Sequence, residues 1–198
     1  MNRVRGVLES LNCDGRLGFA LAAVCVGLLL PTLWGEAGRL ALRYDRTALG
    51  AGELWRLLTA HWVHLNLRHA LVNALGLVLL WALFARDYSG RQWLLIVLAS
   101  ILAIDAGLWL LDKTVEWYVG SSGALHGVMA AGTLAQLRRG HREGWILALI
   151  LTGKLIYEQV AGPLPFSGSA AVVVNAHLYG VAGALVAALA LHPQSVPL

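Results

Sequence analysis

The residues best suited to chemistry form the run Gly120-Ser121-Ser122-Gly123, which opens a short apolar segment. Small neighbours allow a substrate carbonyl to approach Ser122 closely, and free N–H groups at a helix N-terminus can bind an oxyanion. The alternative is a serine that caps the helix, beside glycines that serve helix packing. The pattern makes Ser122 a candidate nucleophile that Gly120 and Gly123 support.

A nucleophilic serine needs a general base, and the candidate is His177. This histidine lies near the start of the last apolar segment, ahead of Gly180 and Gly183. A lone histidine there is more often a hydrogen-bonded structural residue. In the topology predicted below, however, His177 and Ser122 share a depth, and glycines near each residue let their helices approach closely. The combination favours a Ser–His pair.

His69 and Asn73 form a third candidate group, because residues four apart lie on one face of a helix. Side-chain donors aimed at one point stabilise the oxyanion of an acyl-transfer reaction. A hydrogen-bonded contact between helices explains the pair equally well on this evidence alone.

The elements that must position these residues are expected to be membrane helices. Of the 198 residues, 58% are apolar and 13% are charged, whereas soluble domains have about 45–50% and about 25%. So short a chain has too little interior to bury the excess, which makes lipid the expected solvent. The formal charge of +4 fits basic membrane loops, and no nucleic-acid binding is expected.

Six apolar runs predict an all-α polytopic membrane protein, because a span needs about 20 mostly apolar residues. They cover approximately residues 17–34, 66–84, 92–111, 122–137, 145–161 and 170–191. The first run is interpreted as a retained span, since no small-residue cleavage site follows it. The Gly- and Ala-rich run at 122–137 is expected to be central. No internal repeat is visible, so residues 1–198 are predicted to form a single membrane domain.

The distribution of lysine and arginine predicts that both termini are cytoplasmic. In that orientation the cytoplasmic side holds Arg3, Arg5, Arg16, Arg86, Arg91, Arg138, Arg139 and Arg142. The opposite side holds Arg39, Arg43, Arg46, Arg56, Arg68 and Lys113. The contrast between the basic loop at 138–142 and the uncharged loop at 162–169 sharpens this prediction.

The connection from residue 35 to 65 contains Trp55-Arg56 and the run from His61 to His64. This aromatic and cationic mixture is typical of a membrane interface and predicts an ordered, half-submerged element. No ligand-spaced partner accompanies His61 and His64, so interfacial hydrogen bonding is expected there. Cys13 and Cys25 form no disulfide framework or metal pattern. We therefore expect no metal and no other cofactor.

Charged residues inside spans are functional candidates, because lipid makes them costly. Lys154 and Glu158 are four apart on the fifth predicted helix, and an ion pair on one helix face is the preferred interpretation. A role in gating substrate entry is the alternative. Asp105 is a candidate partner for Lys154.

Four motifs together resemble the rhomboid family. His64 to Asn73, in which His69 and Asn73 are four apart, resembles the second-helix signature whose His and Asn assist the oxyanion. Gly120-Ser121-Ser122-Gly123 is similar to the G-x-S-G nucleophile motif. Ala176-His177-Leu178-Tyr179-Gly180 is similar to the A-H-x-x-G motif that carries the base, and Trp55-Arg56 to the W-R pair of the first loop. The motifs follow the family's order over nearly the whole chain.

This resemblance implies a six-helix rhomboid bundle that opens to the extracytoplasmic side and uses a Ser122–His177 dyad. No aspartate orients the base in this family, so Asp105 is not needed as a third member. The chain departs from the family pattern at Ala184, where a glycine is usual, and at His126, where many rhomboids have an aromatic residue. The ring of His126 is expected to stack on His177, or to alter its protonation.

His126, the compact size and the run Gly-Ser-Ser-Gly-Ala-Leu-His-Gly resemble the rhombosortase branch of the family. That implies a multi-pass protease of the bacterial inner (cytoplasmic) membrane. Its partners would be the lipid bilayer and membrane-anchored substrates that end in a Gly-Gly motif, an apolar helix and a basic tail. The alternatives are a rhomboid protease with other single-span substrates, a non-catalytic relative that binds client proteins, and a small transporter. Ser122 and His177 are both present, which weighs against a silent relative.

Overall fold

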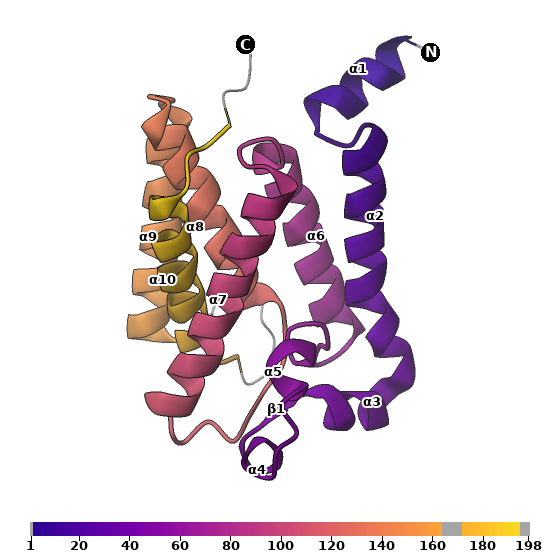
Figure 1. Ribbon diagram of the computed structural model, residues 1–198, viewed down its shortest axis with the longest axis vertical. Coiled ribbons are helices and arrows are strands. Elements are labelled where there is room, and N and C mark those ends of the chain that lie inside the picture. Colours follow the sequence, from indigo (N-terminus) through magenta and orange to yellow (C-terminus); the bar gives the residue numbers. More distant parts are fainter. Residues whose placement is uncertain (1, 164–171, 195–198) are drawn as a thin grey trace.

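The computed structural model describes residues 2–163 and 172–194, and helices dominate it (Figure 1). The N-terminal part contains α1 (Asn2–Ser10), α2 (Gly15–Leu29) and the 3₁₀-helix η1 (Leu30–Trp34). Short elements follow, namely α3 (Gly35–Leu42), β1 (Tyr44–Asp45), α4 (Arg46–Gly50) and α5 (Arg56–Thr59). The remainder comprises α6 (Leu67–Phe84), α7 (Gly90–Leu110), β2 (Trp117–Tyr118), α8 (Ser122–Arg138), α9 (Glu143–Ala161) and α10 (Asn175–Ala190).

Within residues 2–163 and 172–194, four helical stretches are long and apolar enough to cross a membrane, which indicates an integral membrane protein. They are α6, α7, α9 and the stretch Gly15–Leu42, which joins α2, η1 and α3. Helices α8 and α10 have 17 and 16 residues, fewer than the roughly 20 of a typical span. The prediction of six spans therefore stays a prediction.

The helix bounds agree closely with four of the predicted runs. Helices α6, α7, α8 and α9 begin and end within two residues of the runs at 66–84, 92–111, 122–137 and 145–161. The first two residues of the run predicted at 170–191 lie outside the described part of the chain, which resumes at residue 172. Most of the uncharged loop at 162–169 also lies outside the described residues.

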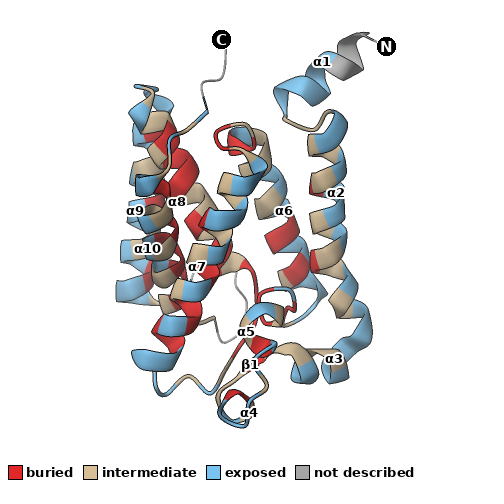
Figure 2. Ribbon diagram, in the orientation of Figure 1, coloured by how far each residue is buried: buried red, intermediate tan, exposed pale blue. Residues whose placement is uncertain are grey.

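Helix α8 lies at the centre of the bundle, where it contacts α6, α7, α9 and α10 (Figure 1). Buried residues gather on α8 and on the inner faces of its neighbours, whereas the outer faces are exposed (Figure 2). The exposed side chains include large apolar ones, such as Leu149 and Val160 of α9, which suit contact with lipid tails. The expectation that the segment at 122–137 is central is confirmed.

Glycines allow α8 and α10 to touch backbone to backbone. A Cβ added at Gly180 would lie 2.2 Å from the carbonyl oxygen of Gly123, and one added at Gly127 would lie 2.7 Å from that of Gly180. A Cβ at Gly123 would lie 2.8 Å from the carbonyl oxygen of Ala176. No larger residue fits these three positions without moving a backbone.

Arg56 orders the connection between η1 and α6. Its side chain is only 8% exposed, and its guanidinium donates to the carbonyl oxygens of Leu40 and Arg43, each at 2.9 Å. It also forms an ion pair with Glu53 at 2.6 Å. The connection is thus an ordered element, as its composition predicted.

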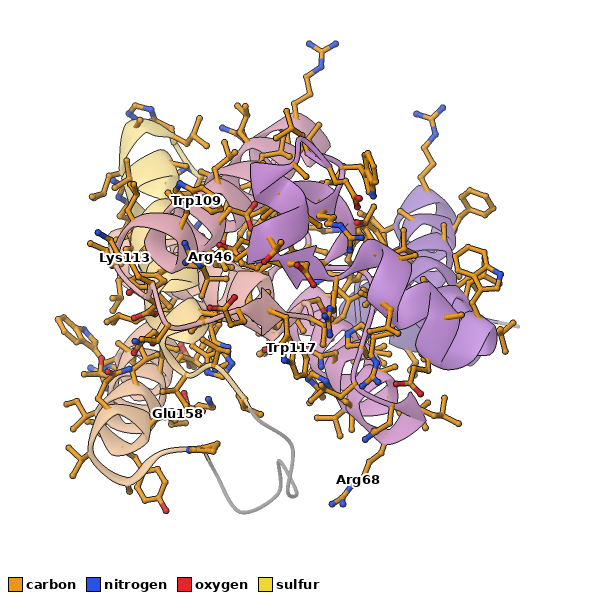
Figure 3. The ribbon with its side chains drawn as sticks, turned by 90° about the horizontal axis from the view of Figure 1, so that it is seen from below. Arg46, Arg68, Trp109, Lys113, Trp117 and Glu158 are labelled. Carbon is orange, nitrogen blue, oxygen red and sulfur yellow. The ribbon has the colours of Figure 1, made fainter. Side chains whose placement is uncertain are left out.

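Arg46 and β1 fasten this connection to the segment that leads into α8. Strand β1 pairs with β2 in antiparallel fashion, with Tyr44 opposite Tyr118. The guanidinium of Arg46 donates to the carbonyl oxygens of Leu108 and Trp109 at the end of α7. It also lies over the ring of Trp109, as seen from the end at which α4 lies (Figure 3).

The two described ends of the chain lie at the same end of the bundle (Figure 1). Near the N-terminus, the amide of Asn12 donates to the carbonyl oxygen of Ala82 at 2.8 Å. Near the C-terminus, the carbonyl oxygen of His192 accepts from the amide of Gln92 at 3.0 Å. Both described ends therefore lie at one end of the bundle, and their location on the cytoplasmic side stays a prediction.

Candidate active site

A tight turn at Gly120 brings Ser122 to the N-terminus of α8. The hydroxyl of Tyr118 donates to the carbonyl oxygen of Gly120 at 2.7 Å, and the N–H of Gly120 donates to the carbonyl oxygen of Ala60 at 2.9 Å. Gly120 has a φ of +119°, and a Cβ there would lie 3.0 Å from the ring of His69. The left-handed backbone favours glycine at this position, and any side chain there would also press on the ring of His69.

His177 lies in the first turn of α10 and meets Ser122 across the contact between α8 and α10. Its Nε2 atom lies 3.0 Å from Ser122 Oγ, which is a hydrogen-bond distance. The side chain is buried, at 4% exposure. The start of α10 is held in place because the Asn175 amide donates to both carboxylate oxygens of Asp112 at 3.0 Å. The serine and the histidine that the sequence paired are therefore in contact.

His126 stacks on His177 one helical turn below Ser122. The two ring centroids are 4.1 Å apart, and the ring planes differ by 18°. The Nδ1 atom of His126 lies 2.7 Å from the carbonyl oxygen of Ser122. A carbonyl oxygen only accepts, so Nδ1 carries the hydrogen. The hydrogen bond fixes the His126 ring, and the stack in turn covers one face of His177.

A carboxylate that sequence reasoning did not assign to the site completes it. Glu158 lies on the side of α9 that faces α10 (Figure 3). Its Oε2 atom lies 2.8 Å from His177 Nδ1, and its Oε1 atom lies 2.6 Å from Lys154 Nζ. The predicted ion pair on α9 is therefore present, and one of its members also contacts the candidate base. The only sequence signal for this role is a carboxylate inside an apolar helix, where it is costly without partners.

The suggested pairing of Asp105 with Lys154 is wrong. Asp105 Oδ1 lies 3.2 Å from His61 Nε2, and both side chains are buried. Lys154 instead meets Glu158. His61 is thus a hydrogen-bonded residue of the protein interior, where a buried carboxylate needs a polar partner, and its predicted location at the depth of the membrane interface stays a prediction.

His69 and Asn73 lie near the start of α6, beside the turn at Gly120, but their side chains differ in orientation. His69 and Ser122 line one pocket, together with Leu65, Trp117, Tyr118, Val119, Val172 and Val173. The Asn73 amide donates to the carbonyl oxygen of His69 at 2.9 Å, and its Oδ1 accepts from Ser121 Oγ at 3.2 Å. His69 thus borders the space above Ser122, whereas Asn73 ties α6 to the preceding serine.

His64 makes a further contact with that preceding serine. Its Nε2 atom lies 3.3 Å from Ser121 Oγ, and the side chain is buried. Burial, together with repulsion from His69, lowers the pKa of His64 to about 4, so the ring is neutral at neutral pH. The hydroxyl of Ser121 is therefore held between His64 and Asn73. Of the two adjacent serines, Ser122 is the one whose hydroxyl meets His177.

His126, Glu158 and His177 offer ligand atoms that lie within 4.8 Å of one another, which raises the question of a metal ion. Both ring nitrogens of His177 already have partners, and so does each oxygen of Glu158. Stacked rings also direct their in-plane lone pairs side by side instead of toward one point. These contacts fit a network of acid–base groups better than a metal centre.

The helices and this site define an integral membrane protein in which a serine, an imidazole and a carboxylate are hydrogen-bonded in series. The family model described as Rhomboid domain matches residues 51–194, more than half of the chain. The protein therefore belongs to the rhomboid family, whose members are generally intramembrane serine proteases. The predicted membership is confirmed. A comparison with curated proteins found no match.

Proposed function

We propose that this protein is an intramembrane serine endopeptidase, with Ser122 as the nucleophile and His177 as the general base. The observation that carries the proposal is the 3.0 Å contact between Ser122 Oγ and His177 Nε2. A serine hydroxyl is a weak nucleophile until an adjacent base takes its proton. Membership of the rhomboid family supports the same chemistry.

In the proposed reaction, His177 Nε2 takes the proton of Ser122 as Oγ attacks the scissile carbonyl carbon. His69, Asn73 and the backbone N–H of Ser122 assist the resulting oxyanion, Asn73 through the amide hydrogen that does not bond to the carbonyl oxygen of His69. The position of His69 beside the pocket supports its part in this step. His177 then gives the proton to the leaving amine, which leaves an acyl-enzyme. Water passes a proton to His177 and attacks the ester; the bond to Ser122 Oγ then breaks, His177 returns the proton to Oγ, and the second product leaves as a carboxylic acid.

The finer proposal concerns the substrates and the location. We propose a multi-pass protein of a bacterial inner membrane that cuts membrane-anchored proteins near the extracytoplasmic face. The substrates would carry a C-terminal Gly-Gly motif, an apolar helix and a basic end, as the resemblance to rhombosortases implies. The support for this subfamily is the sequence resemblance, which rests in part on the histidine at position 126.

The experiment measures labelling by a fluorophosphonate probe and cleavage of a fusion protein that carries such a tail. We expect Ser122→Ala to abolish both, a loss of at least about 10³-fold, because Ser122 Oγ is the hydroxyl that contacts His177. Ser121→Ala is the adjacent-serine control and should lose at most about tenfold, through the Asn73 side chain that its hydroxyl contacts, because the serine that contacts His177 is Ser122. Undiminished labelling or cleavage by Ser122→Ala overturns the proposal.

A second substrate tests the finer proposal separately. A fusion with the Gly-Gly pair replaced by Val-Val should be cleaved much more slowly than the original. Equal cleavage of the two fusions contradicts the assignment of Gly-Gly tails and leaves the protease assignment standing.

A further inference from the structure

Glu158 contacts His177 at Nδ1, the ring nitrogen that faces away from Ser122. A carboxylate has no hydrogen to donate, so the 2.8 Å contact requires that His177 Nδ1 carries the hydrogen. In the neutral ring this leaves Nε2 with its lone pair toward Ser122 Oγ, 3.0 Å away. The contact thus selects the one tautomer in which His177 can accept the serine proton.

Lys154 fixes the carboxylate that makes this contact. Its ammonium lies 2.6 Å from Glu158 Oε1, one helical turn away, and the Glu158 side chain is only 3% exposed. A buried carboxylate is strongly disfavoured unless charge and hydrogen bonds compensate for the lost water. Here each oxygen has one partner, Lys154 on α9 and His177 on α10.

An ion pair between Lys154 and Glu158 that served only stability would not require Glu158 to contact His177 as well. Residues four apart on one helix face can form an ion pair wherever that face points. Helix α9 packs mainly against α8 and much less against α10. The carboxylate nevertheless reaches across to α10 and bonds the nitrogen of His177 that Ser122 does not use.

We propose that Glu158 is a positioning residue for His177, so that the site works as a Ser122–His177–Glu158 triad with Lys154 as its anchor. This inference rests on the proposed function and departs from the dyad that the family resemblance implied. When Nε2 takes the proton of Ser122, the ring becomes an imidazolium with hydrogens on both nitrogens. The proton stays on His177, Glu158 keeps its negative charge and stabilises the cation, and the proton later passes to the leaving amine.

The first test is Glu158→Gln, which keeps the size of the side chain and removes its charge. The amide can donate to Nδ1 and thereby favour the wrong tautomer. We expect the labelling rate of Ser122 and kcat for the tail fusion to fall about 10²–10⁴-fold with little change in KM. The acid limb of the pH–rate profile should move to lower pH, because the imidazolium has lost its neighbouring anion. A purely structural role would not move this limb.

The double variant Lys154→Met with Glu158→Leu keeps the test valid if the glutamine variant fails to fold. Apolar residues of similar size often replace a buried ion pair at no cost in stability. We expect this variant to unfold at or near the wild-type temperature and yet to label as slowly as Glu158→Gln. Added formate should raise the labelling rate of Glu158→Ala several-fold by occupying the vacated carboxylate position.

The outcomes separate the triad from the proposed function. A folded Glu158→Gln or double variant that is labelled at the wild-type rate overturns the triad, and the protease assignment stands if Ser122→Ala is unlabelled. Wild-type protein that is neither labelled nor active overturns the proposed function itself. Slow labelling of the charge-removing variants, with rescue by formate, supports the triad.

Discussion

At the scale of single residues, His126 is the side chain with two separable contacts to the candidate site. Its ring covers one face of His177, and its Nδ1–H donates to the carbonyl oxygen of Ser122. The stack restricts the orientation of the base, whereas the hydrogen bond stiffens the first turn of α8. Either contact alone accounts for a ring at this position.

Two substitutions at His126 separate these contacts. His126→Phe keeps a ring to stack on His177, so we expect the labelling rate of Ser122 to stay within about twofold of the wild type. His126→Ala should lower it about 5–10-fold, because a stacked aromatic pair contributes roughly 0.5–1.5 kcal/mol. The measurement is the labelling rate at one fixed neutral pH. Equal losses in the two variants would assign the role to the hydrogen bond instead.

At the scale of elements, the sequence predicts where helices begin and end better than how they are rotated about their axes. The run at 145–161 predicted α9 to within two residues, because span length and apolar content set its bounds. A helix that is apolar on most sides does not specify which face turns inward. The contact of Glu158 with His177 depends on the rotation of α9 and was not predicted. The partner of Asp105 depends in the same way on the rotation of α7 and was predicted wrongly.

The contact between Ser122 and His177 was easier to predict, because glycines mark the surfaces at which α8 and α10 meet. Gly123 has no side chain to separate the two helices, and Gly180 packs against the carbonyl oxygen of Gly123. Two glycine-rich helix starts at one depth leave few other arrangements. The short elements between residues 35 and 65 were predicted only as an ordered segment, because Arg56 organises them through contacts with backbone carbonyls.

Gly180→Ala tests this packing at the level of the helix pair. The added Cβ would lie 2.2 Å from the carbonyl oxygen of Gly123, so α10 must move away from α8. We expect a loss of roughly 1–3 kcal/mol in stability, the usual cost of overpacking, and slower labelling of Ser122. Thermal unfolding in detergent and the labelling rate measure the two effects.

Gly153→Ala is the matched control for that substitution. Gly153 is exposed in the interior of α9, and an added Cβ meets nothing within 4 Å. It should leave labelling unchanged and raise stability by up to about 1 kcal/mol, because alanine is the better helix former. If both glycine variants behaved alike, close packing at Gly180 would not explain its effect.

On the scale of the whole molecule, the candidate site lies near one end of the bundle and the chain ends lie at the other (Figure 1). Asp112, just beyond α7, bonds to Asn175 and to the hydroxyl of Tyr179 at the start of α10. His177 therefore lies near the part of α7 that ends at Leu110. Helix α7 has 21 residues and is long enough to span a membrane, so a membrane crossed by α7 would have the site nearer to one of its faces, which supports the proposed cleavage near that face.

The side on which this boundary lies follows from the orientation of the bundle, and single cysteines can determine it. We expect Lys113→Cys, beside the candidate site, to react from outside the cell with a membrane-impermeant maleimide in a background lacking Cys13 and Cys25. Arg142→Cys, in the basic loop at the opposite end, should react only after the membrane is permeabilised. Both positions are exposed, so burial does not explain a difference in their reactivity with the maleimide. The excess of arginine near Arg142 predicts that this loop is cytoplasmic. The reverse labelling pattern would show that the candidate site lies near the cytoplasmic face, which contradicts cleavage at the extracytoplasmic face.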